Sequence, residues 1–286
     1  MKLPSGIEFM NALHNNHVRI RVICVLLTAL LAAGCTLPPS DRRSDPPGRT
    51  AAIQRNLLVP GEKLTYAIRT GQFSLGQAEF SIQASETSKD ILHLNLFANS
   101  THPWFPALSY TYKSTVRKSD FATLSFNMEQ TEKSEIEKTV QFEAGYDKRA
   151  GDYSVVKRDV AQKGTVKIDE TVYDYLSIIY LLRKSMPSTG EQLEVPVFHE
   201  TGIVDIKVKN LTERDIVLNN TGRFSASILK PKRNFEDVFF RRGNILLWID
   251  STYRIPLRIV IKLPFGIGRI ELIKAENTQT GDVFIP

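Results

Sequence analysis

The sequence predicts a mainly β domain, built as one large curved antiparallel sheet or half-barrel with a single buried α-helix. Three observations predict it. Apolar and polar residues alternate with a period of two over most of the chain after residue 56, glycines punctuate the alternating runs at turn positions, and one segment switches to helical spacing. The 286 residues are 42% hydrophobic and 24% charged, an ordinary globular composition that excludes a coiled coil or a collagen-like fibre.

A secretory signal peptide is predicted over residues 1–34. Arg19 and Arg21 precede the almost wholly apolar run 22–33. A basic flank followed by an apolar run of this length is typical of export signals, and the run is shorter than the ~20 residues that a membrane-spanning helix needs. The polar stretch before Met10 makes the leader unusually long, so we expect translation to start at Met10.

The apolar run ends in a cysteine preceded by small residues. The sequence Leu31-Ala32-Ala33-Gly34-Cys35 resembles the lipobox of bacterial lipoproteins, although Ala32 stands where that motif usually has leucine. The resemblance implies that Cys35 becomes the first mature residue and carries diacylglycerol and a fatty acyl chain such as palmitate. The alternative is an ordinary export signal followed by a cysteine of no special role. No acidic residue follows Cys35, which by the enteric sorting rule favours the outer membrane, with the domain on its periplasmic side.

The predicted organisation is therefore signal peptide 1–34, lipidated cysteine and tether 35–55, and β-rich domain 56–286. The tether holds four prolines and almost no apolar residues, so it cannot bury enough surface to offset the entropy of ordering. Residues 1–34 carry three basic side chains and one acidic one, a net +2, so the formal charge falls from +6 to +4 on cleavage.

The expected strands follow one another with short turns between them and no internal linker. Strict alternation places one face against a core and the other in water, as in antiparallel sheets, and about a dozen such strands must curl or close. The apolar positions, in chain order, are Leu64-Tyr66-Ile68, Ala78-Phe80-Ile82, Leu92-Leu94-Leu96, Val140-Phe142-Ala144-Tyr146, Leu193-Val195-Val197, Val204-Ile206-Val208, Phe224-Ala226-Ile228, Leu257-Ile259-Ile261 and Ile270-Leu272.

One segment, 171–185, has apolar residues at helical spacing. Thr171 with Asp174 forms a predicted capping box, and Pro187 follows the end of the segment. Apolar residues occupy most sides of this helix, so we expect it to be buried against the concave face of the sheet.

Several short motifs, taken in order, resemble the bacterial domain-of-unknown-function family numbered 3108. They comprise an opening strand and turn, a helix, a late turn and two closing hairpins, and they cover about residues 57–275. The motifs are Val59-Pro60-Gly61-Glu62-Lys63-Leu64-Thr65-Tyr66, Gly76-Gln77-Ala78, Asp174-Tyr175-Leu176-Ser177, Thr221-Gly222-Arg223-Phe224, Trp248-Ile249, Arg254-Ile255-Pro256 and Gly268-Arg269-Ile270-Glu271-Leu272. The resemblance implies an exported, mostly β envelope protein and implies no catalytic residue.

Catalytic and cofactor motifs are absent from the sequence. It contains no nucleophile elbow, P-loop, dinucleotide-binding glycine pattern or His-Glu-x-x-His helix. His93 alternates with strand leucines and is read as a surface residue, while His199-Glu200 at a strand end is the one candidate for acid–base or metal chemistry. We therefore expect no catalytic residue, no metal, no cofactor and no enzymatic activity.

Aromatic and apolar residues in loops and on the helix are the candidate ligand contacts. Trp104 and Phe105 lie between prolines, and Phe265 lies in a predicted hairpin tip. Together with Tyr175 and Ile179 of the helix, they are predicted to line a groove between helix and sheet. The alternative is that these aromatics simply close one end of the barrel.

A second cluster combines basic and aromatic side chains between residues 230 and 242. In an exported protein this composition favours anionic lipid or glycan over nucleic acid, which we do not expect as a partner. The alternative is a solvated loop and strand face. The cluster comprises Lys230, Lys232, Arg233, Phe235, Phe239, Phe240, Arg241 and Arg242.

Three functions compete at this stage. The first is binding of an amphiphilic or glycan component of the envelope on a curved apolar sheet, an analogy of architecture only. The second is an adaptor or structural partner of an envelope protein complex. The third, an envelope hydrolase, has the least support from the motifs.

The lipobox predicts that Cys35→Ser releases the protein from membranes. One acyl chain binds a bilayer only marginally, but two or three hold a protein firmly, so loss of the acylated cysteine removes the anchor. Membrane fractionation after a salt wash measures this. Cys24→Ser, within the segment to be cleaved, is the control and leaves fractionation unchanged; a Cys35→Ser protein that stays with the membrane contradicts the lipobox.

Overall fold

A computed structural model of the chain describes residues 58–100, 107–158, 160–218, 222–233, 245–263, 266–281 and 283–285. Within them, fifteen antiparallel strands form one sheet, accompanied by the helix α3 (Ser177–Lys184). The expected single curved antiparallel sheet with one buried helix is confirmed. In the described part of the chain, no helix is long and apolar enough to cross a membrane.

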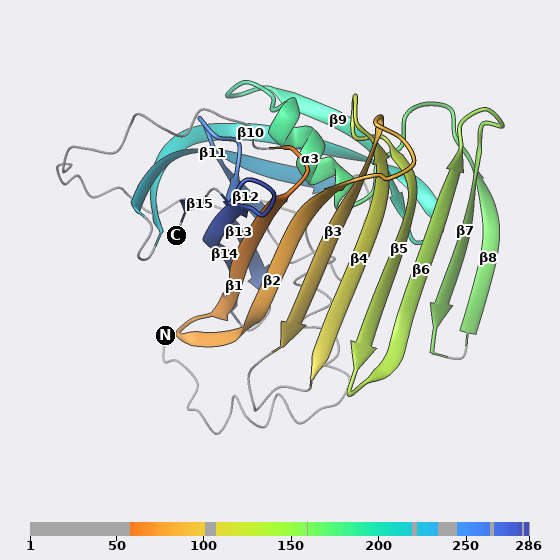
Figure 1. Ribbon diagram of the computed structural model, residues 1–286, viewed down its shortest axis with the longest axis horizontal. Coiled ribbons are helices and arrows are strands. Elements are labelled where there is room, and N and C mark those ends of the chain that lie inside the picture. The colour runs from red at the N-terminus through yellow and green to blue at the C-terminus, as the bar shows by residue number, and fades with distance from the viewer. Residues whose placement is uncertain are drawn as a thin grey trace.

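The first eight strands form a meander in which each strand pairs with the next. Figure 1 shows β2 to β8 side by side as one curved wall, with α3 near the upper end of that wall. The strands are β1 Glu62–Thr70, β2 Phe73–Ala84, β3 Ile91–Ser100, β4 Leu108–Arg117, β5 Thr123–Glu132, β6 Glu135–Gly145, β7 Ala150–Lys157 and β8 Val160–Lys167.

The second half is also a meander, and it joins the first half at β1. The sheet order is β8-β7-β6-β5-β4-β3-β2-β1-β14-β13-β12-β11-β10-β9, so β1 lies near the middle and β8 and β9 are the two edges. β15 pairs with β14 outside this path. The strands are β9 Gln192–His199, β10 Gly202–Leu218, β11 Gly222–Arg233, β12 Ile245–Asp250, β13 Pro256–Leu263, β14 Gly266–Asn277 and β15 Val283–Ile285.

The sheet curls until edge strand β9 packs against the inner side of β6. The ring of Phe198 in β9 stacks on Phe142 in β6 with 4.2 Å between centroids, and it also contacts Phe126 and Tyr153. Stacked aromatic pairs of this kind add to the free energy of burying apolar surface. The sheet is thus a half-barrel whose two halves share one aromatic core, and in the described part of the chain its edge strands β8 and β9 do not pair with each other.

The helix begins later than the sequence analysis predicts, and the proposed Thr171–Asp174 capping box is wrong. Tyr173 lies in extended backbone, because its N–H and C=O pair with Pro196 and Phe198 of β9. The reciprocal cap forms one turn later: the Asp174 carboxylate accepts from the N–H of Ser177 (2.8 Å), and the Ser177 hydroxyl accepts from the N–H of Asp174 (2.8 Å).

The Asp174 carboxylate is buried and also joins the helix to the sheet. The hydroxyl groups of Ser114 and Thr123 both donate to its Oδ2 atom. Burial raises the pKa of Asp174, while these hydrogen bonds act in the opposite direction. The carboxylate also accepts from the N–H of Leu176 at 2.7 Å, and these four hydrogen bonds mark a structural role for it.

The last turn of α3 is fixed by a buried ion pair between Arg183 and Glu62 of β1. Two guanidinium nitrogens of Arg183 each lie 2.6 Å from a Glu62 oxygen, and the Nε atom donates to the carbonyl of Arg254 at 2.8 Å. The side chains are 0% and 1% exposed. Burial opposes the positive charge, but the adjacent Glu62 carboxylate keeps the pKa of Arg183 above its usual value.

Burial of the helix predicts a clear difference between its inner and outer residues. Leu176 and Leu182 are buried in the core, whereas Lys184 is exposed and donates to the carbonyl of Ser119. We expect Leu176→Ala and Leu182→Ala each to cost about 2–5 kcal/mol of unfolding free energy. Thermal melts compare them with Lys184→Ala, and small equal shifts in all three contradict the packing described here.

Removing one partner of the buried ion pair should cost far more than removing a surface partner. Glu62→Gln leaves the Arg183 charge uncompensated, with an expected loss of about 3–5 kcal/mol. Glu79 pairs with Lys63 at 2.7 Å on the partly exposed outer face, so Glu79→Gln is the matched control and costs at most about 1 kcal/mol. Urea denaturation measures the unfolding free energy of both variants. Equal losses of unfolding free energy would refute the structural role of the pair.

Candidate functional site

An exposed aromatic side chain marks the end of the sheet at which β1 stops and β2 starts. Leu64, Tyr66 and Ile68 of β1 point into the core, so by alternation Thr70 lies on the same side. Thr70 pairs with Phe73 of β2 and with Gly268 of β14. Phe73 therefore faces the core side at the mouth of the half-barrel, where it is 47% exposed.

A β-bulge aims Phe73 in this direction. Ile68 pairs with Gly76 and Arg69 with Ser74, which leaves Leu75 as an extra, buried residue of β2. In a regular ladder, Leu75 would pair with Arg69, and Phe73 would then alternate onto the outer face. Gly76 is required next to the bulge, because a Cβ atom there would meet the carbonyl oxygen of Asn99 at 1.9 Å.

Ile267 lies at the same end of the sheet. The hydroxyl of Thr70 donates to the carbonyl of Ile267 at 3.3 Å, and the Ile267 side chain is 48% exposed. Because Gly268 and Ile270 are on the core side, Ile267 alternates onto the outer face of the sheet, next to Thr70. Thr70 and Phe73 define what we call the mouth: one hydroxyl beside one exposed aromatic side chain on the core side. Such a pairing of polar and apolar groups suits an amphiphile.

The residues predicted as ligand contacts divide into two groups. Trp104, Phe105 and Phe265, like the lipidation residue Cys35, lie outside the described residues. The chain leaves β3 at Ser100, which pairs with Gly76, and enters β14 at Gly266. The described ends of β3 and β14 therefore lie at the end of the sheet where the mouth lies.

Tyr175 and Ile179 do not lie at the mouth. Ile179 is buried in the hydrophobic core, and Tyr175 shares a hydrogen bond with Nδ1 of His199. The adjacent Glu200 is ion-paired with Lys138 of β6. Burial opposes ionisation of Glu200, but the Lys138 charge prevails and lowers the pKa of this carboxyl group.

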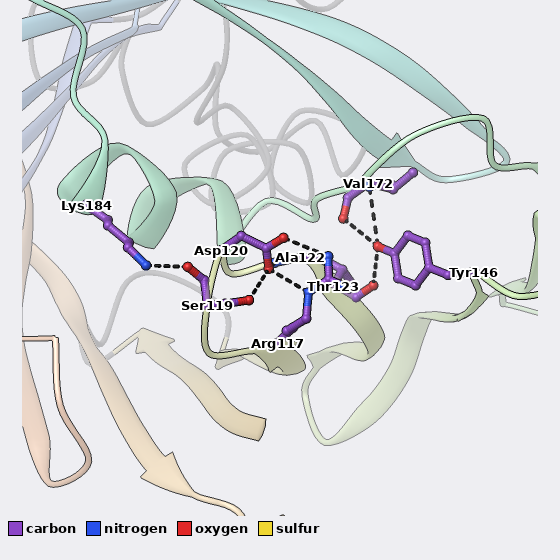
Figure 2. Close-up of polar contacts among 8 residues, drawn as sticks. All are labelled: Arg117, Ser119, Asp120, Ala122, Thr123, Tyr146, Val172 and Lys184. Atoms are coloured by element: carbon purple, nitrogen blue, oxygen red, sulfur yellow. Dashed lines mark hydrogen bonds and ion pairs between the residues drawn. The ribbon is translucent and has the colours of Figure 1, made fainter. Parts of the chain in front are cut away.

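Figure 2 shows how the β4–β5 turn is tied to the helix. Asp120 accepts two hydrogen bonds from Arg117, at 2.9 and 2.7 Å, and one from the N–H of Ala122 at 3.2 Å. Lys184 of α3 donates to the carbonyl of Ser119 in the same turn. The hydrogen bonds from Arg117 lower the pKa of Asp120, which is held as a structural acceptor.

The neighbouring Tyr146 hydroxyl joins the start of β5 to the segment before the helix. The hydroxyl oxygen lies 2.8 Å from the carbonyl oxygen of Thr123, to which it donates, and 3.2 Å from the carbonyl oxygen of Val172 (Figure 2). These contacts hold the backbone in place. In the described ranges, no cluster of three or more His, Cys, Asp or Glu residues is placed to hold a metal ion.

Sequence reasoning did not identify Glu62, Phe73 or the pairing of lysines in β10 and β11. Glu62 carried a usable signal, since it alternates in phase with Leu64, Tyr66 and Ile68 and must face the core. The sequence holds no such signal for Phe73, because the orientation of its side chain depends on the bulge.

Comparisons with known proteins show the fold and the family. The crystal structure of a β-barrel-like protein of the domain of unknown function DUF1849 from Brucella abortus is similar, with a TM-score of 0.54 and 9% sequence identity over 76% of this chain and 97% of that one. No curated protein matches the chain. The family model described as "Protein of unknown function (DUF3108)" matches residues 65–273, more than half of the chain, and this protein therefore belongs to the DUF3108 family.

Proposed function

We propose that this protein binds an amphiphilic or glycan component of the cell envelope at the mouth, without catalysing a reaction. The observation that carries the proposal is the exposure of Phe73 on the core side of the sheet, where the residues farther along the same side, such as Ile68 and Leu75, are 2% and 1% exposed. An apolar stripe that begins in the core thus ends in solvent beside the hydroxyl of Thr70.

The polar side chains near the helix already hydrogen-bond within the protein, and this supports a binding role over a catalytic one. Asp174, Glu62 and Asp120 each accept several hydrogen bonds from the protein itself, and His199 is bonded to Tyr175. A general acid or base must reach a substrate, which side chains committed to such contacts do poorly.

The proposed location follows from the signal peptide and Cys35. An acyl anchor on Cys35 would hold the domain at the periplasmic side of the outer membrane, where lipids and glycans are the abundant ligands. The predicted tether, residues 35–55, would give the mouth freedom to meet them, since proline-rich chain reaches about 3 Å per residue.

The adaptor alternative is favoured by strand β8. This strand forms one edge of the sheet, its residues are largely exposed, and Val160 is 72% exposed. An exposed edge strand offers unpaired N–H and C=O groups to a strand of a partner protein.

The ligand test compares two phenylalanines of equal exposure. Phe73 faces the mouth, whereas Phe97 of β3 is 48% exposed on the outer face. We expect Phe73→Ser to weaken binding of a soluble fatty acid about three- to tenfold, because a ligand would bury the exposed half of a side chain whose full burial is worth ~1.5–3 kcal/mol. We expect Phe97→Ser to leave the affinity unchanged.

Titration with a fatty acid below its micellar concentration, followed by tryptophan fluorescence, measures the affinity. Short glycan fragments of the envelope are titrated in parallel. An equal effect of the two substitutions, or no saturable binding of either ligand class, overturns the proposal and leaves the adaptor function ahead.

A further inference from the structure

Four lysines lie opposite one another on the β10–β11 hairpin. Lys207 pairs with Lys232 and Lys209 pairs with Lys230. Paired residues of an antiparallel ladder share a face, so all four side chains project from one side of the hairpin. Ile206 and Val208, which alternate with Lys207 and Lys209, are fully buried, so the lysines occupy the opposite face. We call this set the lysine ladder.

Within the described ranges, the lysine ladder is only partly neutralised. Glu194 of β9 lies 3.3 Å from Lys207, whereas the residue of β9 opposite Lys209 is the uncharged Gln192. Among the described residues, Lys209, Lys230 and Lys232 make no ion pair. Asp205, two residues before Lys207 on the same face, is the second acidic neighbour, so four positive and two negative charges leave a net +2 on a small area. Like charges directly opposite in a ladder destabilise it, so folding alone does not favour this arrangement.

The ladder lies at the same end of the sheet as the mouth. One row of paired residues crosses the strands from Thr70 to Gly268 of β14, Ile261 of β13 and Ile245 of β12. Leu247 lies two residues after Ile245 in β12. It pairs with Leu229 of β11, which is next to Lys230. The lysines therefore flank the continuation of the row that contains Thr70 and its partner Phe73, on the next strands across. Ile267 lies beside this row on the outer face, which is also the face of the lysines.

We propose that the lysine ladder docks this end of the domain on an anionic lipid surface. Lysines near such a surface are attracted by the phosphate groups of its lipids, and exposed apolar residues such as Ile267 enter the boundary between headgroups and acyl chains. The charge complementarity and the shared end of the sheet are the two observations that favour a bilayer as the occupant. The proposal goes beyond ligand binding at the mouth, since the lysines lie on the outer face.

The experiment measures co-sedimentation with phosphatidylcholine vesicles that contain or lack phosphatidylglycerol. The full chain is used, with Cys35→Ser in every sample so that no acyl anchor contributes. The test variant is Lys209→Gln with Lys230→Gln. The control is Lys113→Gln with Lys163→Gln, which removes the same charge from exposed positions on β4 and β8, neither opposite another lysine.

We expect the ladder variant to lose about tenfold in partitioning onto phosphatidylglycerol vesicles, and the control less than about twofold. Added salt weakens binding of the parent protein, because it screens exposed charges. Lys209→Arg with Lys230→Arg keeps the charge and retains binding. Loss of repulsion should leave the glutamine variant at least as thermally stable as the parent, so lost binding cannot be ascribed to unfolding.

Equal losses in the ladder and control variants would show that only net charge matters and would overturn the proposal. Binding that does not depend on phosphatidylglycerol would overturn it as well. Failure of this proposal is separable from failure of the proposed function, because the fatty-acid titration tests the mouth in solution without a bilayer.

Discussion

The buried ion pair between Glu62 and Arg183 is the contact on which the arrangement of the two halves depends. Glu62 begins β1, the strand at which the two meanders meet, and Arg183 lies in the helix that connects β8 to β9. The same guanidinium reaches the carbonyl of Arg254 between β12 and β13. Desolvating both charges is costly, and a well-packed apolar pair could be as stable. The ion pair instead fixes one position of the helix against both halves of the sheet.

The polar contacts and the exposed apolar residues lie at opposite ends of β1. Glu62 is its first residue and Thr70 its last, so the helix and its ion pair are fixed at one end and the mouth lies at the other. At the helix end, Asp174 and Tyr146 also join the start of β5 to the chain before α3. Such a division lets one end of a half-barrel supply rigidity while the other meets a ligand or a surface.

The sequence predicted the strands well because their pattern is local. Runs such as Leu64-Tyr66-Ile68 and Leu92-Leu94-Leu96 alternate in the chain and are buried in the fold. The helix start was misplaced because Tyr173 pairs with residues of β9 more than twenty positions away. The orientation of Phe73 and the apposition of Lys209 with Lys230 likewise depend on a bulge and a strand register, which a period-two pattern does not determine.

Two features that do not favour the fold occur at one end of it. Phe73 is turned towards the mouth by a bulge that interrupts the β1–β2 ladder, and Lys209 faces Lys230 across a ladder that opposite charges would stabilise better. Local choices in a protein usually agree with its global fold, and departures from that agreement concentrate at functional sites. A single departure could be accommodated anywhere on the sheet. Here the apolar mouth and the lysine ladder lie along one row of paired residues that crosses neighbouring strands. A surface that contacts an anionic, amphiphilic layer requires both an apolar part and a basic part.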